Sequence, residues 1–322
     1  ALAAAPIGQV LYVGGVQISS TGYWTTDSEG NVTAYTGGDT PTDNYIHYDV
    51  ANNTLTLHNA TIKESVSTNT STFIAGAAIG VHNQNGAAEL TITLEGTNTI
   101  AEVGKGIYVL ANSTGGATLT ITGDGSLDAS ASQTGIWVQS NSGNATLTIR
   151  NAKVEATGTS RGVNVQSHES STASLTVDGG SLTASGSPGI LYDSIGSGTA
   201  PNTTALTISN SAIVDARGGG IGAGLLQDLK KVSPADDSVG IVFDNGTGTV
   251  YGDATLQENL TIGEGESLTI PDGSSLNCNE KLTNNGTILA SGGTVTGSLS
   301  GGTTITTPSI SQQPTGQTVT EG

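Results

Sequence analysis

The sequence predicts an all-β protein: a right-handed parallel β-helix with three strands per coil, about 28 residues per coil and an N-terminal β cap. A strand motif of the form LTI recurs through the middle of the chain, and a Gly-Ile or Gly-Val landmark recurs at the same interval. The lead leucines are separated by 35, 29, 28, 28 and 31 residues: Leu55, Leu90, Leu119, Leu147, Leu175 and Leu206. Units repeated in this way cannot bury their apolar side chains alone, so they stack on their neighbours.

Each period contains three short stretches in which apolar and polar residues alternate. In the fourth copy they are 147–149, 154–156 and 163–165. Alternation places leucine, isoleucine and valine on one face of a strand and polar residues on the other. No helical pattern and no two-residue hairpin turn such as Asn-Gly lies between these stretches, which favours parallel stacking over a meander. A β-sandwich is the competing interpretation.

The two ends of the chain differ from the repeats. Residues 1–50 lack the repeat and hold most of the aromatic residues, so they are expected to cap the exposed end of the solenoid. Residues 51–238 form the main repeats, with a short helical insertion expected near 225–232. The apolar pattern resumes with tighter spacing in 239–306, which predicts smaller coils. Residues 307–322 are expected to be a linker or the start of a following domain.

Composition restricts the classes of partner. The chain has 9 Lys and Arg against 27 Asp and Glu, a formal charge of −18, which argues against nucleic acid because its binding depends on cations that neutralise phosphate. Cys278 is the only cysteine, so no disulfide framework is expected. No apolar run is long enough to insert into a membrane. The first residues, ALAAAPIGQ, resemble the remnant of a signal-peptidase site, and we expect an extracellular location.

Two segments resemble a known module. LYVGGVQIS (11–19) and YDVANNTLTLHNATI (48–62) look like strands that lead into β-helical repeats in large secreted and surface-anchored proteins of gut-type Gram-positive bacteria. The terminal PSISQQPTGQTVTEG resembles the first strand of a bacterial immunoglobulin-like domain. The resemblance implies a pectate-lyase-like β-helix at the bacterial cell surface. That fold family holds polysaccharide lyases, glycoside hydrolases, carbohydrate-binding domains and adhesins, so the fold does not decide the function.

The repeats contain few groups suited to catalysis or metal binding. Asp128 and Glu155 are expected one coil apart on the outward side of the second stretch, where they face water, bind Ca²⁺ or share a proton. If the two carboxylates simply face water, the chain needs no cofactor, and Ca²⁺ is the one cofactor that the sequence offers as an alternative. Arg150 and Asp178 occupy equivalent places on neighbouring coils, which predicts an ion pair between coils.

The third stretch carries the candidate binding residues. Tyr108 and Trp137 are expected side by side on its outward face, and amide side chains lie beside them. Exposed aromatic rings next to amides are typical of a surface that binds sugars or a partner protein. The alternative is that a long loop covers the rings. The candidate ligand-binding residues are Tyr108, Trp137, Gln139, Asn164 and Gln166.

These observations lead to one functional expectation and one alternative. We expect a non-catalytic module that acts in adhesion or glycan binding, or as a rigid stalk that displays neighbouring domains. Its partners would be glycans or host and cell-surface proteins, with no nucleic acid. The alternative is a polysaccharide lyase or glycoside hydrolase that acts on an extracellular polysaccharide.

Overall fold

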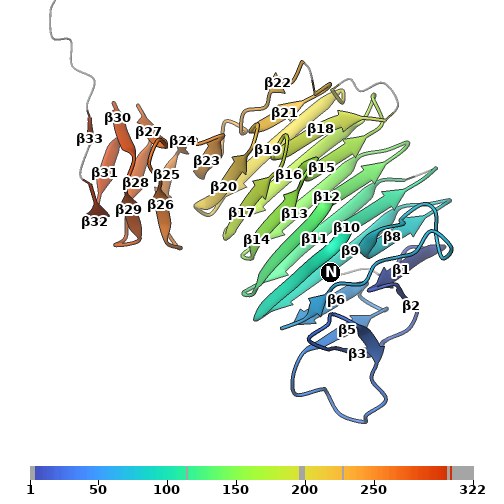
Figure 1. Ribbon diagram of the computed structural model, residues 1–322. Helices are drawn as coiled ribbons and strands as arrows, with labels where there is room; N and C mark the ends of the chain where they lie inside the picture. The colour runs from blue at the N-terminus through green and yellow to red at the C-terminus, as the bar shows by residue number, and fades with distance from the viewer. Residues whose placement is uncertain (1–3, 114, 196–199, 227, 303–304, 307–322) are drawn as a thin grey trace, which may run out of the picture.

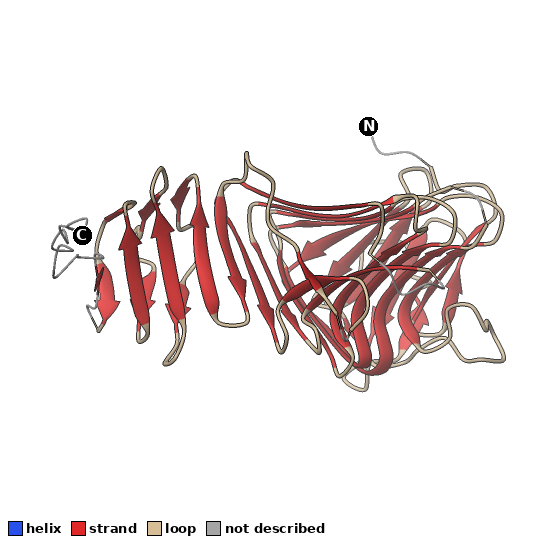
Figure 2. Ribbon diagram, turned by 90° about the horizontal axis from the view of Figure 1, so that it is seen from above, coloured by secondary structure: helices blue, strands red, loops and turns tan. Residues whose placement is uncertain are grey.

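The computed structural model describes residues 4–113, 115–195, 200–226, 228–302 and 305–306. It confirms the predicted fold class: an all-β solenoid of about six turns, whose parallel coils repeat about every 28 residues, with a β-stranded cap at the N-terminal end (Figure 1). The linker or following domain predicted for residues 307–322 lies outside the described residues. The part of the chain that the structure describes contains strands and loops and no helix (Figure 2), so it holds no helix able to cross a membrane.

The LTI strands form the first sheet, which continues without a break into the cap. Apolar residues point inward and threonines outward along each strand, as in β13, where Leu147 is fully buried and Thr148 is half-buried. The order across this sheet is β19 (Thr203–Ser209), β16 (Thr172–Asp178), β13 (Ala145–Arg150), β11 (Ala117–Gly123), β9 (Ala88–Glu95), β6 (Thr54–His58), β5 (Tyr45–Asp49), β3 (Gly22–Thr26) and β4 (Val32–Ala34).

The second and third stretches of each period form two further faces. Two long strands, β10 (Thr97–Ala111) and β12 (Ser126–Ser140), bend around the corner and belong to both faces. The other strands of the second face are β7 (Thr61–Ile62), β14 (Lys153–Gly158), β17 (Ser181–Ser185), β20 (Ala212–Arg217) and β23 (Gly240–Asp244). Those of the third face are β8 (Ala77–Asn83), β15 (Arg161–Ser167), β18 (Ile190–Ser194) and β21 (Ile221–Ala223).

The register follows the sequence repeat except at the first coil. Leu119, Leu147 and Leu175 lie in one column, as predicted. Leu55, however, pairs with Ile92 and not with Leu90. The shift is two residues, so the alternation and the inward direction of the side chains are preserved.

Glycines shape the corners between faces. Gly123 has φ of +112°, and a Cβ atom there would overlap the carbonyl oxygen of Leu94 on the preceding coil. Gly180 has φ of +68°, and a Cβ atom there would overlap the carbonyl oxygen of Ala152. Only glycine fits such positions without strain, which explains why these turns keep a Gly-rich sequence.

The cap closes the N-terminal end with antiparallel pairing. Strand β1 (Gln9–Val13) pairs with β8 of the first coil and with β2 (Val16–Ile18). Strand β5 pairs antiparallel with β6 and β3. The backbone groups at this edge of the solenoid are therefore satisfied, which protects it from pairing with another chain.

The expected helix near 225–232 is wrong. Leu225 and Leu226 are exposed, and the segment then forms the short strand β22 (Lys230–Lys231), antiparallel to β21. Leu229 lies against Gly222, and Val232 is buried in the main core. Pairing with the open edge of β21 satisfies backbone groups that a helix of this length would leave exposed, and so overrides the helical spacing of the leucines.

A second, smaller solenoid follows, also with three faces. Its first face contains β24 (Thr247–Tyr251), β27 (Ser267–Pro271), β30 (Thr287–Ser291) and β33 (Ile305–Thr306). The other two contain β25 (Asp253–Thr255), β28 (Ser275–Asn277) and β31 (Thr294–Thr296), and β26 (Leu260–Ile262), β29 (Leu282–Asn284) and β32 (Leu299–Gly301).

The two solenoids share one sheet but use its opposite sides. On β23, Val242 points into the main core, whereas Ile241 and Phe243 belong to the core of the smaller solenoid. The β23–β24 hairpin also reverses the strand direction. The hand of a solenoid inverts if the strands run in the opposite direction, and it also inverts if the opposite side of the sheet faces the core. Because both changes occur here, the hand of the solenoid is preserved. The smaller solenoid is therefore displaced to the outer side of the second face without a change of hand.

We expect Leu147→Ala to lower the free energy of unfolding by about 2–5 kcal/mol, because it leaves a cavity in a fully buried column. Thr148→Ala, on the outward side of the same strand, is the matched control and should cost less than about 1 kcal/mol. Urea denaturation followed by circular dichroism measures both values. Equal losses for the two variants would contradict the assigned inward and outward directions.

Candidate functional site

The structure brings all five predicted binding residues together around Trp137 on the outer side of the third face. Trp137 lies between Tyr108 and Asn164 in one row across the coils. Gln139 and Gln166 are paired in the next outward row. Trp137, Gln139 and Gln166 are half-buried and reach the surface, whereas Asn164 is completely buried beneath them. We call this surface, together with Arg161 and Asp193, the Trp137 face.

Tyr108 supports this face and does not line its surface. Its ring stacks on the indole of Trp137, with the ring centroids 4.6 Å apart and an angle of 21° between the planes. Only 5% of Tyr108 is exposed, because Val66 and Ile74, from the segment between β7 and β8, pack with it. The loop that the sequence left as an alternative therefore covers Tyr108 but leaves Trp137 partly open.

A chain of hydrogen bonds fixes the amide of Gln139. The hydroxyl group of Tyr108 donates to Oε1 of Gln139 at 2.6 Å, and Nε2 of Gln139 donates to Oδ1 of Asn141 at 2.8 Å. Burial raises the pKa of Tyr108 well above its usual range, so the hydroxyl stays protonated and remains a donor. Nζ of Lys105 lies 5.6 Å from the centre of the Tyr108 ring, where a cation is attracted to the π-system. The stacking on Trp137, the hydrogen bond to Gln139 and the nearby Lys105 cation together fix the Tyr108 ring.

Unpaired polar atoms gather beneath the surface of the Trp137 face. Among the described residues, four contribute buried polar atoms without a hydrogen-bond partner there: Nε1 of Trp137, Nε of Arg161, both amide atoms of Asn164 and Oδ1 of Asp193. A buried polar group without a partner costs about 1–3 kcal/mol, so such groups are rare unless water or a ligand satisfies them. Their concentration at one place makes the Trp137 face the candidate site.

Asp193 gives the site a titratable group. It is only 8% exposed, and burial raises its pKa to about 6, although the positive charge of Arg161 and the nearby Asn164 amide, which does not meet hydrogen-bond geometry with Asp193, act in the opposite direction. The alternation of the third stretch places Asp193 outward beside Gln166. It does not place Arg161, which precedes the Gly-Val landmark and lies in the row of Lys105 and Thr134.

The described strands of the Trp137 face do not bring two carboxylates together. Asp193 is the only carboxylate in the two outward rows that the described strands place on this face. Asp128 and Glu155 are paired one coil apart as expected, but both are exposed on the second face. Within the described residues, no three His, Cys, Asp or Glu side chains are grouped so as to hold a metal ion. The Ca²⁺ interpretation of Asp128 and Glu155 stays a prediction.

The predicted ion pair between coils is confirmed. Nε of Arg150 lies 3.0 Å from Oδ2 of Asp178. Asp178 also accepts hydrogen bonds from Ser209 and Asn210. These bonds, with that from Arg150, hold the pKa of Asp178 below its usual value. A carboxylate stabilised in its charged form and satisfied by neighbouring coils serves the stacking of the solenoid.

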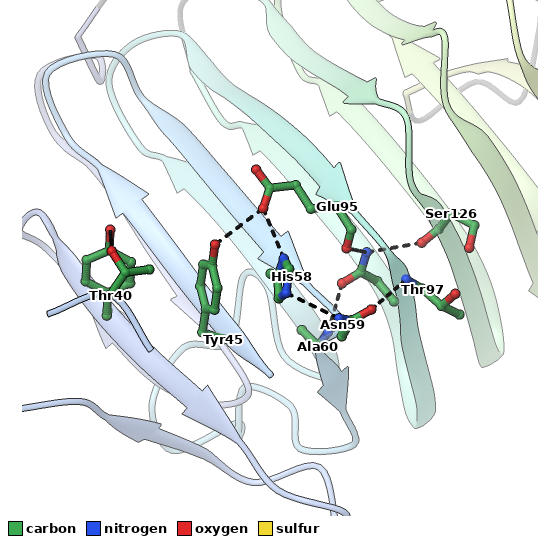
Figure 3. A network of polar contacts seen from close by, with 10 residues as sticks. Thr40, Tyr45, His58, Asn59, Ala60, Glu95, Thr97 and Ser126 are labelled. Carbon is green, nitrogen blue, oxygen red and sulfur yellow. Dashed lines mark hydrogen bonds and ion pairs between the residues drawn. The ribbon is translucent and has the colours of Figure 1, made fainter. Parts of the chain in front are cut away.

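A second polar and aromatic cluster joins the cap to the first coils, and the sequence did not single it out (Figure 3). Tyr45 stacks on His58 with ring centroids 4.6 Å apart, and the ring centroids of Tyr23 and His47 are 4.4 Å apart. His58 Nδ1 and the hydroxyl group of Tyr45 both contact Oε2 of Glu95, at 3.1 and 3.3 Å. Because the rings cover one another's faces, this cluster offers mainly ring edges, and it stabilises the cap across strands.

Comparisons with known proteins add no family to this picture. No protein-family model matches the chain, and neither the curated proteins nor the solved structures give a match.

The raised pKa of Asp193 predicts a pH-dependent stability. An unfolded Asp has a pKa near 3.9, so between about pH 4 and 6 the folded protein binds the extra proton and gains stability as pH falls. As pH rises through about 6, that contribution is lost. Asp193→Asn cannot titrate, so the stability of wild type relative to this variant should fall by about 1–3 kcal/mol between pH 4 and 7. Urea denaturation at several pH values in this range measures the free energy of unfolding of both proteins. The same dependence on pH in wild type and variant would contradict a raised pKa of Asp193.

Proposed function

We propose that this protein is a non-catalytic, extracellular module of a bacterial surface protein that binds glycans at the Trp137 face. One observation carries the proposal: a half-buried indole, backed by Tyr108, lies beside half-buried amides and above unpaired buried donors and acceptors. Glycans present apolar C–H faces that pack on aromatic rings and hydroxyl groups that both donate and accept hydrogen bonds. The Trp137 face offers partners for both.

The polar groups suit a neutral glycan. Trp137 and Arg161 supply N–H donors, Asp193 supplies an acceptor, and Asn164 supplies both kinds of group. Gln139 and Gln166 add amides at the surface. A ligand hydroxyl can pair with a donor and an acceptor at once, so a polyhydroxylated ligand satisfies more of these groups than an ion of one sign.

The fold and composition support a surface role. The two solenoids are joined through a continuous sheet, which makes an elongated and rigid scaffold suited to display (Figure 1). The formal charge of −18 favours solubility outside the cell and disfavours nucleic acid. The resemblance to pectate-lyase-like modules of gut-type Gram-positive bacteria, with their adhesin-like and carbohydrate-binding members, points to the same role. Host or cell-surface glycoproteins are then the natural partners.

We expect Trp137→Ala to weaken glycan binding at least about tenfold, the equivalent of ~1.4 kcal/mol, because it removes the ring that packs on the sugar. A glycan array identifies the ligand, and isothermal titration calorimetry then measures the dissociation constants of wild type and variant.

Tyr35→Ala is the matched control, because it removes a partly exposed aromatic ring from the cap and should leave binding unchanged. Two results would count against the proposal: no glycan retained by the wild type, or equal affinity of wild type and Trp137→Ala. Release of sugar products from a polysaccharide panel would overturn the non-catalytic assignment.

A further inference from the structure

The junction of the two solenoids forms a cleft that is separate from the Trp137 face. The smaller solenoid is displaced to the outer side of the second face, so the outer surfaces of β14, β17 and β20 meet the segment around β26 at an angle. This elbow encloses a cleft of about 280 Å³. The hydroxyl group of Ser181 donates to Oε2 of Glu258 at 3.2 Å and joins the two walls. We call this space the elbow cleft.

The floor of the elbow cleft is apolar. Ile213 and Phe243 are outward residues of β20 and β23 and belong to the core of the smaller solenoid. Leu260, half-buried on β26, packs against that core and also lines the cleft. The floor therefore offers an apolar patch that remains in contact with the open space.

Charged side chains of both signs surround this floor. On the main solenoid, Nη2 of Arg217 lies 2.6 Å from Oδ2 of Asp215. The side chain of Lys153 also lines the cleft and has no side-chain partner among the described residues. On the smaller solenoid, Glu258 and Glu266 line the facing wall. The carboxylate of Glu266 also helps to raise the pKa of Arg217, after the larger effect of Asp215, so its charge acts across the cleft.

Neither an anion nor a cation fits this lining best. Two cations and three carboxylates are distributed around the cleft, so a ligand with a single charge meets repulsion as well as attraction. A hydroxyl group can donate to a carboxylate and accept from Lys or Arg at the same time. An apolar patch at the base with paired donors and acceptors at the rim suits one pyranose ring, and the volume lies at the small end of ligand pockets.

We propose that the elbow cleft is a second binding site, which takes one neutral sugar unit. This site lies away from the Trp137 face and would recognise a sugar differently. It lacks an exposed aromatic ring and relies on charged side chains of both signs. Together the two sites would place sugar contacts on different sides of one rigid scaffold.

Calorimetry with glucose, galactose, mannose, fucose and N-acetylglucosamine tests this proposal on the whole chain. We expect at least one sugar to bind the Trp137→Ala variant, which lacks the other proposed site, and we expect Lys153→Ala to weaken this binding at least tenfold and Thr183→Tyr, which fills the cleft, to abolish it. Lys153 is exposed and Thr183 half-buried, so both variants should fold, which circular dichroism checks. Lys230→Ala, an exposed lysine outside the cleft, is the matched control and should bind as wild type does.

The Trp137→Ala variant separates the two sites. If it binds these sugars as wild type does while Thr183→Tyr does not, the elbow cleft is an independent site, whatever the result at the Trp137 face. Loss of binding in Trp137→Ala but not in Thr183→Tyr would assign the sugar to the Trp137 face and overturn the proposal. Absence of binding at tens of millimolar sugar, or tighter binding of glucuronate or glycine than of any neutral sugar, would overturn it as well.

Discussion

The in-register stacking of parallel coils is the constraint on which the rest of this structure depends. Neighbouring strands lie about 4.8 Å apart, so each inward side chain is covered by the equivalent residue of the next coil. Leu119, Leu147 and Leu175 are completely buried for this reason, although each strand is short. The same stacking leaves a coil at either end without a neighbour, which explains the antiparallel cap and the pairing of β22 with β21.

The sequence repeat predicted the parts of the structure that recur in every coil. It could not predict segments that occur only once in the chain. The inward columns and the neighbours Tyr108, Trp137 and Asn164 followed from counting residues between landmarks. The cover over Tyr108 comes from Val66 and Ile74, in a segment with no periodic equivalent, so no spacing could locate it. Leucine spacing suggested a helix at 225–232, but the open edge of β21 offered backbone partners that local pattern does not reveal.

The change of core at β23 was also beyond the sequence, for a physical reason. Alternation shows that Val242 and Ile241 point to opposite sides of a strand, but both are apolar, and either side could be the interior. A strand that is apolar on both sides is the signature of a sheet buried on both sides. In this chain it joins two solenoids, and the resulting displacement creates the elbow cleft. Its walls come from residues far apart in the sequence, such as Lys153 and Glu258, which are 105 positions apart.

The position of the polar atoms separates function from scaffold in this fold. Arg150 and Asp178 are polar but mutually satisfied, and threonines on the first sheet need no partner beyond water, so both serve the solenoid. Trp137, Asn164 and Asp193 depart from this pattern because their polar atoms are buried without partners. Buried polar atoms without partners weaken a fold, so the packing of the coils gives no reason for them. They are the observation on which the proposed glycan site depends.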